Sequence, residues 1–237
     1  YRLVGSEMCI RDRSTRYPPV LLPSPLEVGQ AALSGADKLI EATTTTALSS
    51  LGGLLIAVGF GLLGAMLFTR SRWLEAALYP YAILVQTVPI VAIAPLLVVW
   101  LGYGQPPAIA SAAIVSFFPV LTAANLGLRS TPPEQLELFA LYNAGFLRTL
   151  LHLRLPGALP FLFSGLRTAA GLSVIGAIVG EFVGSNGIPP SLGFVVLRSA
   201  RSADTATSFA AIFAAAALAL LFFSCLLYTS DAADDLY

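Results

Sequence analysis

Long runs of apolar residues alternate with short polar segments along this chain, a pattern typical of membrane-spanning helices. No charged residue lies between Glu75 and Arg129, an interval too long for one membrane span and suited to two. Glycine, glutamine and proline residues at 102–107 divide that interval. Further candidate spans cover residues 47–68, 159–183 and 206–223. The pattern predicts an all-α, polytopic transmembrane bundle in which five spans are visible.

The composition agrees with a membrane protein and leaves little for catalysis. Hydrophobic residues make up 57% of the 237 residues and charged residues 11%, with a mean hydropathy of +0.81, unlike soluble domains. The only lysine, Lys38, lies in no glycine-rich loop, so the chain has no phosphate-binding motif. The only histidine, His152, is more typical of a solvated helix than of a catalytic base. Basic residues are too scattered for nucleic-acid binding. We expect no catalytic residue, metal site or cofactor.

A polar-flanked amphipathic insert separates two apolar runs and reads ELFALYNAGFLRTLLHLRLP over residues 137–156. Thr131 can cap a helix in which Pro132 takes the first position and Glu134 completes a capping box. The pattern therefore predicts one short helix starting there. Asn143 to Gly145 tolerate a left-handed turn, and a second apolar spacing predicts another short helix that ends at Pro156.

The insert resembles the cytoplasmic coupling loop of ABC importer permeases, whose pattern is E-A-A, three residues, G, nine residues, I, one residue, L-P. Glu137 matches the acid, and Leu138 and Phe139 stand at the alanines. Asn143 stands at the glycine, followed in register by Leu153, Leu155 and Pro156. On spacing alone, an ordinary amphipathic surface loop fits as well. Within the loop, 131–157, the resemblance implies these residues for coupling to an ATPase: Glu137, Ala140, Asn143, Gly145, Leu153, Leu155 and Pro156.

Segments on both sides of the loop extend the resemblance over about residues 22–223. Residues 155–182, 86–104 and 22–28 are similar to the nitrate, sulfonate, taurine and thiamine-precursor branch of these permeases. The resemblance implies a type I ABC importer permease in the bacterial inner membrane. It also implies these partners: a separate ATP-binding subunit that binds the ATP, a second permease copy, an extracytoplasmic solute-binding protein and membrane lipid.

Two sets of residues are candidates for the translocation path or gate. Pro89 and Pro95 interrupt the second span just after Gln86 and Thr87, and the backbone groups they free can line a water-filled path. A simple proline kink packed against neighbouring helices fits equally. Glu181 is a charge inside a later span, preceded by small residues that allow close helix approach, so it is a candidate dimer or gate contact.

Arginines predict the orientation. Arg70 and Arg72 follow the first visible span, and Arg129, Arg148 and Arg154 flank or occupy the coupling-like loop. Because positive charge is retained on the cytoplasmic side, both loops are expected there. The loop at 184–205 then faces outward.

The two ends of the chain resemble translated adapter DNA. MCIRDR at 8–13 and CLLYT at 225–229 back-translate to one inverted DNA repeat of the kind found in sequencing-library adapters. We therefore expect residues 1–13 and 225–237 to be artefacts, 14–224 to be the permease domain, and its first helix, before residue 22, to be truncated. A signal region and an acidic tail are the alternative, but 8–13 lacks an apolar core. Both cysteines lie in these ends, so thiol chemistry is not expected.

Two other classes of membrane protein compete with this hypothesis. A secondary transporter driven by ions in place of ATP often has paired broken helices in its two halves, whereas only the 86–95 segment is broken here. A non-transporting scaffold would need neither a proline-broken span nor an intramembrane Glu181.

Overall fold

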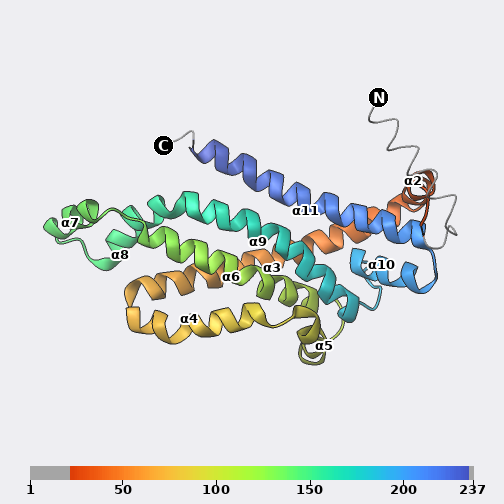
Figure 1. The fold of residues 1–237 in the computed structure, drawn as a ribbon, viewed down its shortest axis with the longest axis horizontal. Helices are drawn as coiled ribbons and strands as arrows, with labels where there is room; N and C mark the ends of the chain where they lie inside the picture. The colour runs from red at the N-terminus through yellow and green to blue at the C-terminus, as the bar shows by residue number, and fades with distance from the viewer. Residues whose placement is uncertain (1–21, 235–237) are drawn as a thin grey trace.

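The computed structural model describes residues 22–234, and within them every regular element is a helix (Figure 1). The prediction for residues 1–13 lies outside the described residues, as does that for 235–237. The elements are α2 (Pro25–Ser34), α3 (Ala36–Arg70), α4 (Arg72–Thr87), α5 (Ile90–Leu101), α6 (Gln105–Arg129), α7 (Pro133–Leu141), α8 (Phe146–Thr149), the π-helical turn η1 (Leu150–Arg154), α9 (Leu155–Gly184), α10 (Leu192–Arg201) and α11 (Thr205–Asp234).

Within residues 22–234, four helical stretches are long and apolar enough to cross a membrane, namely α3, α6, the stretch Phe146–Gly184 and α11. A fifth span is available if α4 and α5 count together, although they are bent by 98°. The prediction of an all-α bundle with five visible spans is therefore confirmed. Helix α11 continues through residues 225–234. The expected origin of this segment in adapter DNA concerns the DNA that encodes it, and it stays a prediction.

The bend between α4 and α5 corrects one prediction. Val88 is extended, with φ −74° and ψ 125°, and Pro89 caps α5, so the break lies at Pro89. A proline disfavours the helical conformation of the residue before it and has no amide to donate. Pro95 was also expected to interrupt the span, but it lies inside α5. There it removes a single backbone hydrogen bond, which a membrane helix tolerates.

Helices α3, α6 and α9 form the centre of the bundle, where small residues bring their backbones together. A Cβ added at Gly180 of α9 would lie 2.6 Å from Cα of Ala108 in α6. One added at Gly53 of α3 would lie 2.4 Å from Cβ of Ala112. Between apolar helices in lipid, such close approach provides the packing that holds them together. The small-residue spacing before Glu181 therefore serves contact between α9 and α6.

The two ends of this bundle carry different short helices. Figure 1 shows α7 and α8 projecting beyond α6 and α9 at one end, while α2 and α10 lie at the opposite end. The segment at 184–205, predicted as a loop, contains α10. The candidate functional residues divide between these ends.

Candidate functional site

Helix α7 begins one residue later than its sequence predicts. Pro132 is the N-cap, with φ −57° and ψ 139°, Pro133 is the first helical residue, and no side chain caps the helix. The predicted capping box of Thr131 and Glu134 is therefore wrong. Because the residue before a proline is driven out of the helical region, the second proline moves the helix start past Pro132.

The turn after α7 is centred on Asn143, within the segment Asn143 to Gly145 where the sequence predicts it. Asn143 has φ +50°, its amide donates to Ala140 O at 2.9 Å, and the amide of Ala144 donates to Phe139 O at 3.0 Å. These two bonds form a Schellman motif with Asn143 at its left-handed position. Gly145 instead has φ −65°, which any residue can adopt, and it precedes α8.

The second half of the segment corrects another prediction. Pro156 was expected to end a short helix, but the helical path runs from α8 through η1 into α9, and Pro156 lies in the first turn of α9. The amide of Leu155 donates to Leu150 O, five residues back, in the π-helical turn. Pro156 has no amide, so it is tolerated where the hydrogen-bond register changes. Leu153 and Leu155 thus belong to a continuous helical connection.

Helix α8 is attached to the bundle, while most residues of α7 are exposed. Leu150 is buried in the core cluster, and the guanidinium of Arg70, at the end of α3, lies 5.5 Å from the ring centre of Phe146. Glu137 and Ala140 are exposed. Large apolar side chains are exposed beside them, and we call these the α7–α8 surface: Leu138, Leu141, Tyr142, Leu147 and Leu151. Apolar side chains grouped on an exposed projection are typical of a protein-binding surface.

A polar cluster joins the ends of α3, α4 and α6 near this surface. The carboxylate of Glu75 pairs with Arg129 and accepts a hydrogen bond from Asn125 Nδ2 at 3.0 Å. Arg129 also donates to Phe68 O at 3.2 Å. The cluster thus joins α3, α4 and α6. It was not predicted, although Glu75 and Arg129 are the two charges that bound the uncharged interval.

The pathway candidates around the α4–α5 bend are on the surface of the chain. Gln86, Thr87, Pro89 and Pro95 are all exposed, and the hydroxyl of Thr87 donates to Leu84 O at 2.9 Å. They are therefore available to a water-filled path or to a second copy. Their role stays a prediction.

Glu181 is buried, in contrast, and holds the amino end of α10. Its side chain is 3% exposed, and Oε2 accepts hydrogen bonds from Thr46 Oγ1 at 3.0 Å and from the amide of Gly193 at 2.9 Å. Thr46 Oγ1 in turn accepts from the amide of Leu192 at 3.0 Å. The first amides of a helix carry partial positive charge, so they suit a carboxylate. The polar contacts of Glu181 are thus with α3 and α10 of its own chain.

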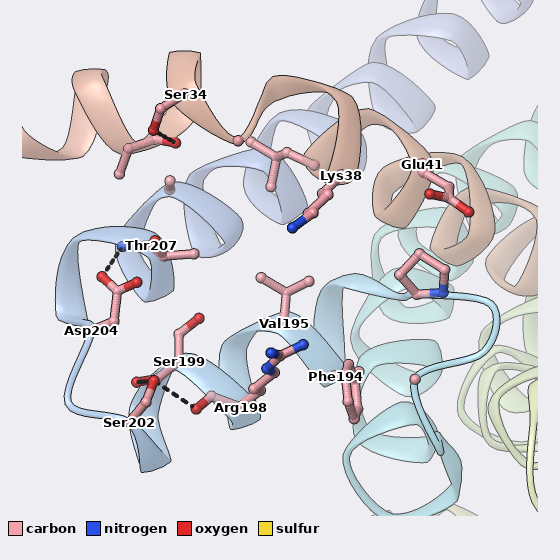
Figure 2. A pocket seen from close by; sticks show the side chains of 16 residues that line it. Ser34, Lys38, Glu41, Phe194, Val195, Arg198, Ser199, Ser202, Asp204 and Thr207 are labelled. Atoms are coloured by element: carbon pink, nitrogen blue, oxygen red, sulfur yellow. Dashed lines mark hydrogen bonds between the residues drawn. The ribbon is translucent and has the colours of Figure 1, made fainter.

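A cavity of about 570 Å³ opens beside α10, between α2, α3 and the start of α11 (Figure 2). Lys38 and Arg198 point into the space between α3 and α10. Asp204 also lines the cavity, and its carboxylate accepts from the amide of Thr207 at 3.1 Å. The lining also includes Glu41, so this end of the bundle combines an open cavity with two cationic and two anionic side chains.

Comparison with known proteins identifies relatives over most of the chain. Residues 57–233 match the family described as "Binding-protein-dependent transport system inner membrane component". The chain is 40% identical over 209 residues to a "Probable ABC transporter permease protein" of Haemophilus influenzae, covering 88% of this chain and 84% of that protein. It is 35% identical over 210 residues to "Formylaminopyrimidine transport permease protein ThiX" of Halalkalibacterium halodurans, covering 87% and 82%.

A solved structure of similar fold is described as "Inward facing conformations of the MetNI methionine ABC transporter". The TM-score is 0.66 at 17% identity, and the match covers 84% of this chain and 95% of that one. At this identity, the match establishes the fold. Together with the sequence relatives, it confirms the resemblance inferred from the loop and its flanking segments.

Proposed function

This chain belongs to the inner membrane components of binding-protein-dependent transport systems, the permeases of ABC transporters, and from that membership we propose how it works. As a multi-pass inner-membrane protein, it forms the translocation path of an importer driven by a separate ATP-binding subunit. The loop at 131–157 docks on that subunit from the cytoplasmic side. A second permease copy completes the path, and an external binding protein delivers the solute.

The α7–α8 surface is the observation that carries this proposal. Leu141 and Tyr142 are each 80% exposed at the end of the bundle, where an unpartnered apolar side chain faces water. A groove on an ATPase subunit would cover them, with Glu137 at its polar edge. Asn143 at its left-handed position fixes how α7 projects from α8.

The helical connection supports the transmission of movement. Helix α8 continues through η1 into α9, so a displacement of α8 is carried directly into a membrane span. Leu150 anchors the start of this connection in the core. ATPase closure would thus move α9 relative to α3 and α6, and the path would change from inward-open to outward-open.

The opposite end of the bundle is the proposed outer face. Helix α10 and the cavity containing Lys38 and Arg198 lie there, far from α7. Lys38 and Arg198 can pair with anionic groups of a solute or of a binding-protein edge, and Glu41 and Asp204 can pair with cationic ones. The name of the relative from Halalkalibacterium halodurans, a formylaminopyrimidine permease, supports a heteroaromatic solute.

The test is a pair of matched substitutions in the full transporter, reconstituted with its ATPase and binding protein in proteoliposomes. Leu141→Asp places a carboxylate in the α7–α8 surface, while Gln135→Asp places one on another exposed face of the same helix. We expect Leu141→Asp to abolish co-purification of the ATPase and solute-stimulated ATP hydrolysis, with Gln135→Asp close to wild type. Solute uptake that needs an ion gradient and no ATP would instead identify a secondary transporter.

A further inference from the structure

A second cavity, of about 280 Å³, lies behind the α7–α8 surface, and we call it the arginine cavity. Its lining comes from the ends of α3, α4 and α6 and from the loop. The lining residues are Thr69, Arg72, Leu128, Arg129, Thr131, Leu136 and Arg154. It is therefore a polar recess with three guanidinium groups, two hydroxyls and an apolar wall.

The charges of this cavity are not balanced by its lining. Glu75 pairs with Arg129 from outside the lining, and no lining residue is a carboxylate. Nε of Arg154 is buried and has no hydrogen-bond partner. That nitrogen is closed to the cavity, but guanidinium groups are charged donors whose planar fork suits phosphate, so an anion in the cavity would balance the charge of its lining.

The position of the cavity points to the membrane surface. The span formed by α3 ends at Arg70, the span formed by α6 ends at Arg129, and α9 begins directly after Arg154. Trp73, next to Arg72, is 86% exposed. Tryptophan concentrates at the level of the lipid headgroups, where its ring meets both the apolar core and water. The cavity thus lies where phosphate groups of the bilayer are found.

We propose that the arginine cavity binds the phosphate of an anionic phospholipid headgroup. The guanidinium groups of Arg72 and Arg154 hold the phosphate oxygens, and Leu136, which is partly exposed, faces the apolar part of the lipid. The bound headgroup contacts α4, α6 and the loop, and so stabilises the segment from which α7 projects. The assignment to the inner leaflet rests on the orientation in the proposed function, but the binding itself does not.

Free phosphate offers the same chemistry, so the experiment separates the two sources. The permease, purified in mild detergent without its ATPase, is examined by native mass spectrometry with added phosphatidylglycerol, phosphatidylcholine or inorganic phosphate. We expect phosphatidylglycerol to remain bound in preference to phosphatidylcholine, and millimolar phosphate not to displace it. Displacement by phosphate, or equal retention of both lipids, would overturn the lipid assignment.

Substitutions of single arginines test which side chains bind the lipid. Arg154→Gln is expected to weaken phosphatidylglycerol binding about tenfold, the effect of losing one charge-assisted hydrogen bond. Arg72→Gln, at an exposed position, gives a second test if Arg154→Gln does not fold. Arg148→Gln, an exposed arginine of α8 outside the cavity, is the matched control and should bind as wild type. Unchanged binding in both cavity variants would refute the proposal.

A further arm asks whether the partner subunit occupies the cavity. If adding the ATPase subunit expels the lipid, the arginines serve the protein interface and the lipid proposal is wrong. If the lipid persists and only the α7–α8 variants lose the ATPase, the two sites are independent. Loss of ATPase coupling with lipid binding intact would leave this inference standing whatever becomes of the proposed function.

Discussion

The contact between Thr46 and the amino end of α10 gives the sharpest prediction. Thr46 is fully buried, and its hydroxyl both donates to Glu181 Oε2 and accepts from the amide of Leu192. Thr46→Val keeps the shape of the side chain and removes both hydrogen bonds. Thr46→Ser keeps the hydroxyl and removes one methyl group, so it is the matched control.

The magnitude follows from the groups left without partners. The valine variant leaves the Leu192 amide without an acceptor, at a cost of about 1–3 kcal/mol, and removes a charge-assisted bond to Glu181 worth about 1.5–3 kcal/mol. Gly193 still donates to Glu181, so the carboxylate is not wholly unpaired. We expect α10 to lose about 2–4 kcal/mol of local stability. The serine variant should lose about 1 kcal/mol, mainly from the cavity left by the methyl group.

Hydrogen exchange of the α10 peptide measures this loss directly, because local opening controls exchange of its amides. A loss of 2–4 kcal/mol corresponds to exchange roughly 30-fold to 800-fold faster. Peptides from α7 should exchange as in wild type. If the α10 amides exchange at the same rate in the valine and serine variants, the Thr46 hydroxyl contributes nothing to the stability of α10. The proposed role of Thr46 and Glu181 in holding α10 is then refuted.

Three further predictions concern the turn, the packing and the open cavity. Asn143→Gly should keep or slightly raise the thermal stability, since glycine prefers positive φ, while Asn143→Val should cost about 2 kcal/mol and speed proteolysis of the loop. Gly180→Ala should lower the melting temperature of the purified permease because its Cβ would meet α6 at 2.6 Å, whereas Gly171→Ala, with no atom within 4 Å, should not. Replacing Lys38 and Arg198 by glutamine should slow capture of the binding protein, and equal rates at low and high salt in the wild type would argue against an electrostatic contact.

The membrane spans could be predicted because their signal is local. The length of each apolar run determines whether it can cross the bilayer, and no partner needs to be known. The turn at Asn143 is also local, since a left-handed residue must tolerate positive φ. These features depend on a few neighbouring residues, so the sequence is sufficient for them.

The wrong predictions concern helix ends at prolines, because a proline can lie before a helix, in its first turn or after its end. Pro156 can end a helix or lie in its first turn, and the π-helical turn before it decides the matter through a backbone bond from Leu155 to Leu150. Thr131 could cap a helix, but the order of Pro132 and Pro133 moves the start beyond its reach. The start of α7 follows from a local rule that the capping pattern overrode, whereas the place of Pro156 depends on the continuous helix that packs against α6.

The partner of Glu181 could not be predicted for a different reason. A carboxylate inside a span requires a partner, yet Thr46 lies 135 residues away and the other donors are backbone amides, which every residue has. Helix α9, which carries Glu181, also joins the two ends of the molecule. From Leu155 to Glu181 the helix rises roughly 39 Å, so α9 carries the end of the loop at 131–157 at one end and the hydrogen bonds to α10 at the other. In the proposed mechanism a displacement of α9 at the ATPase side must therefore strain the bonds from Glu181 to Thr46 and Gly193.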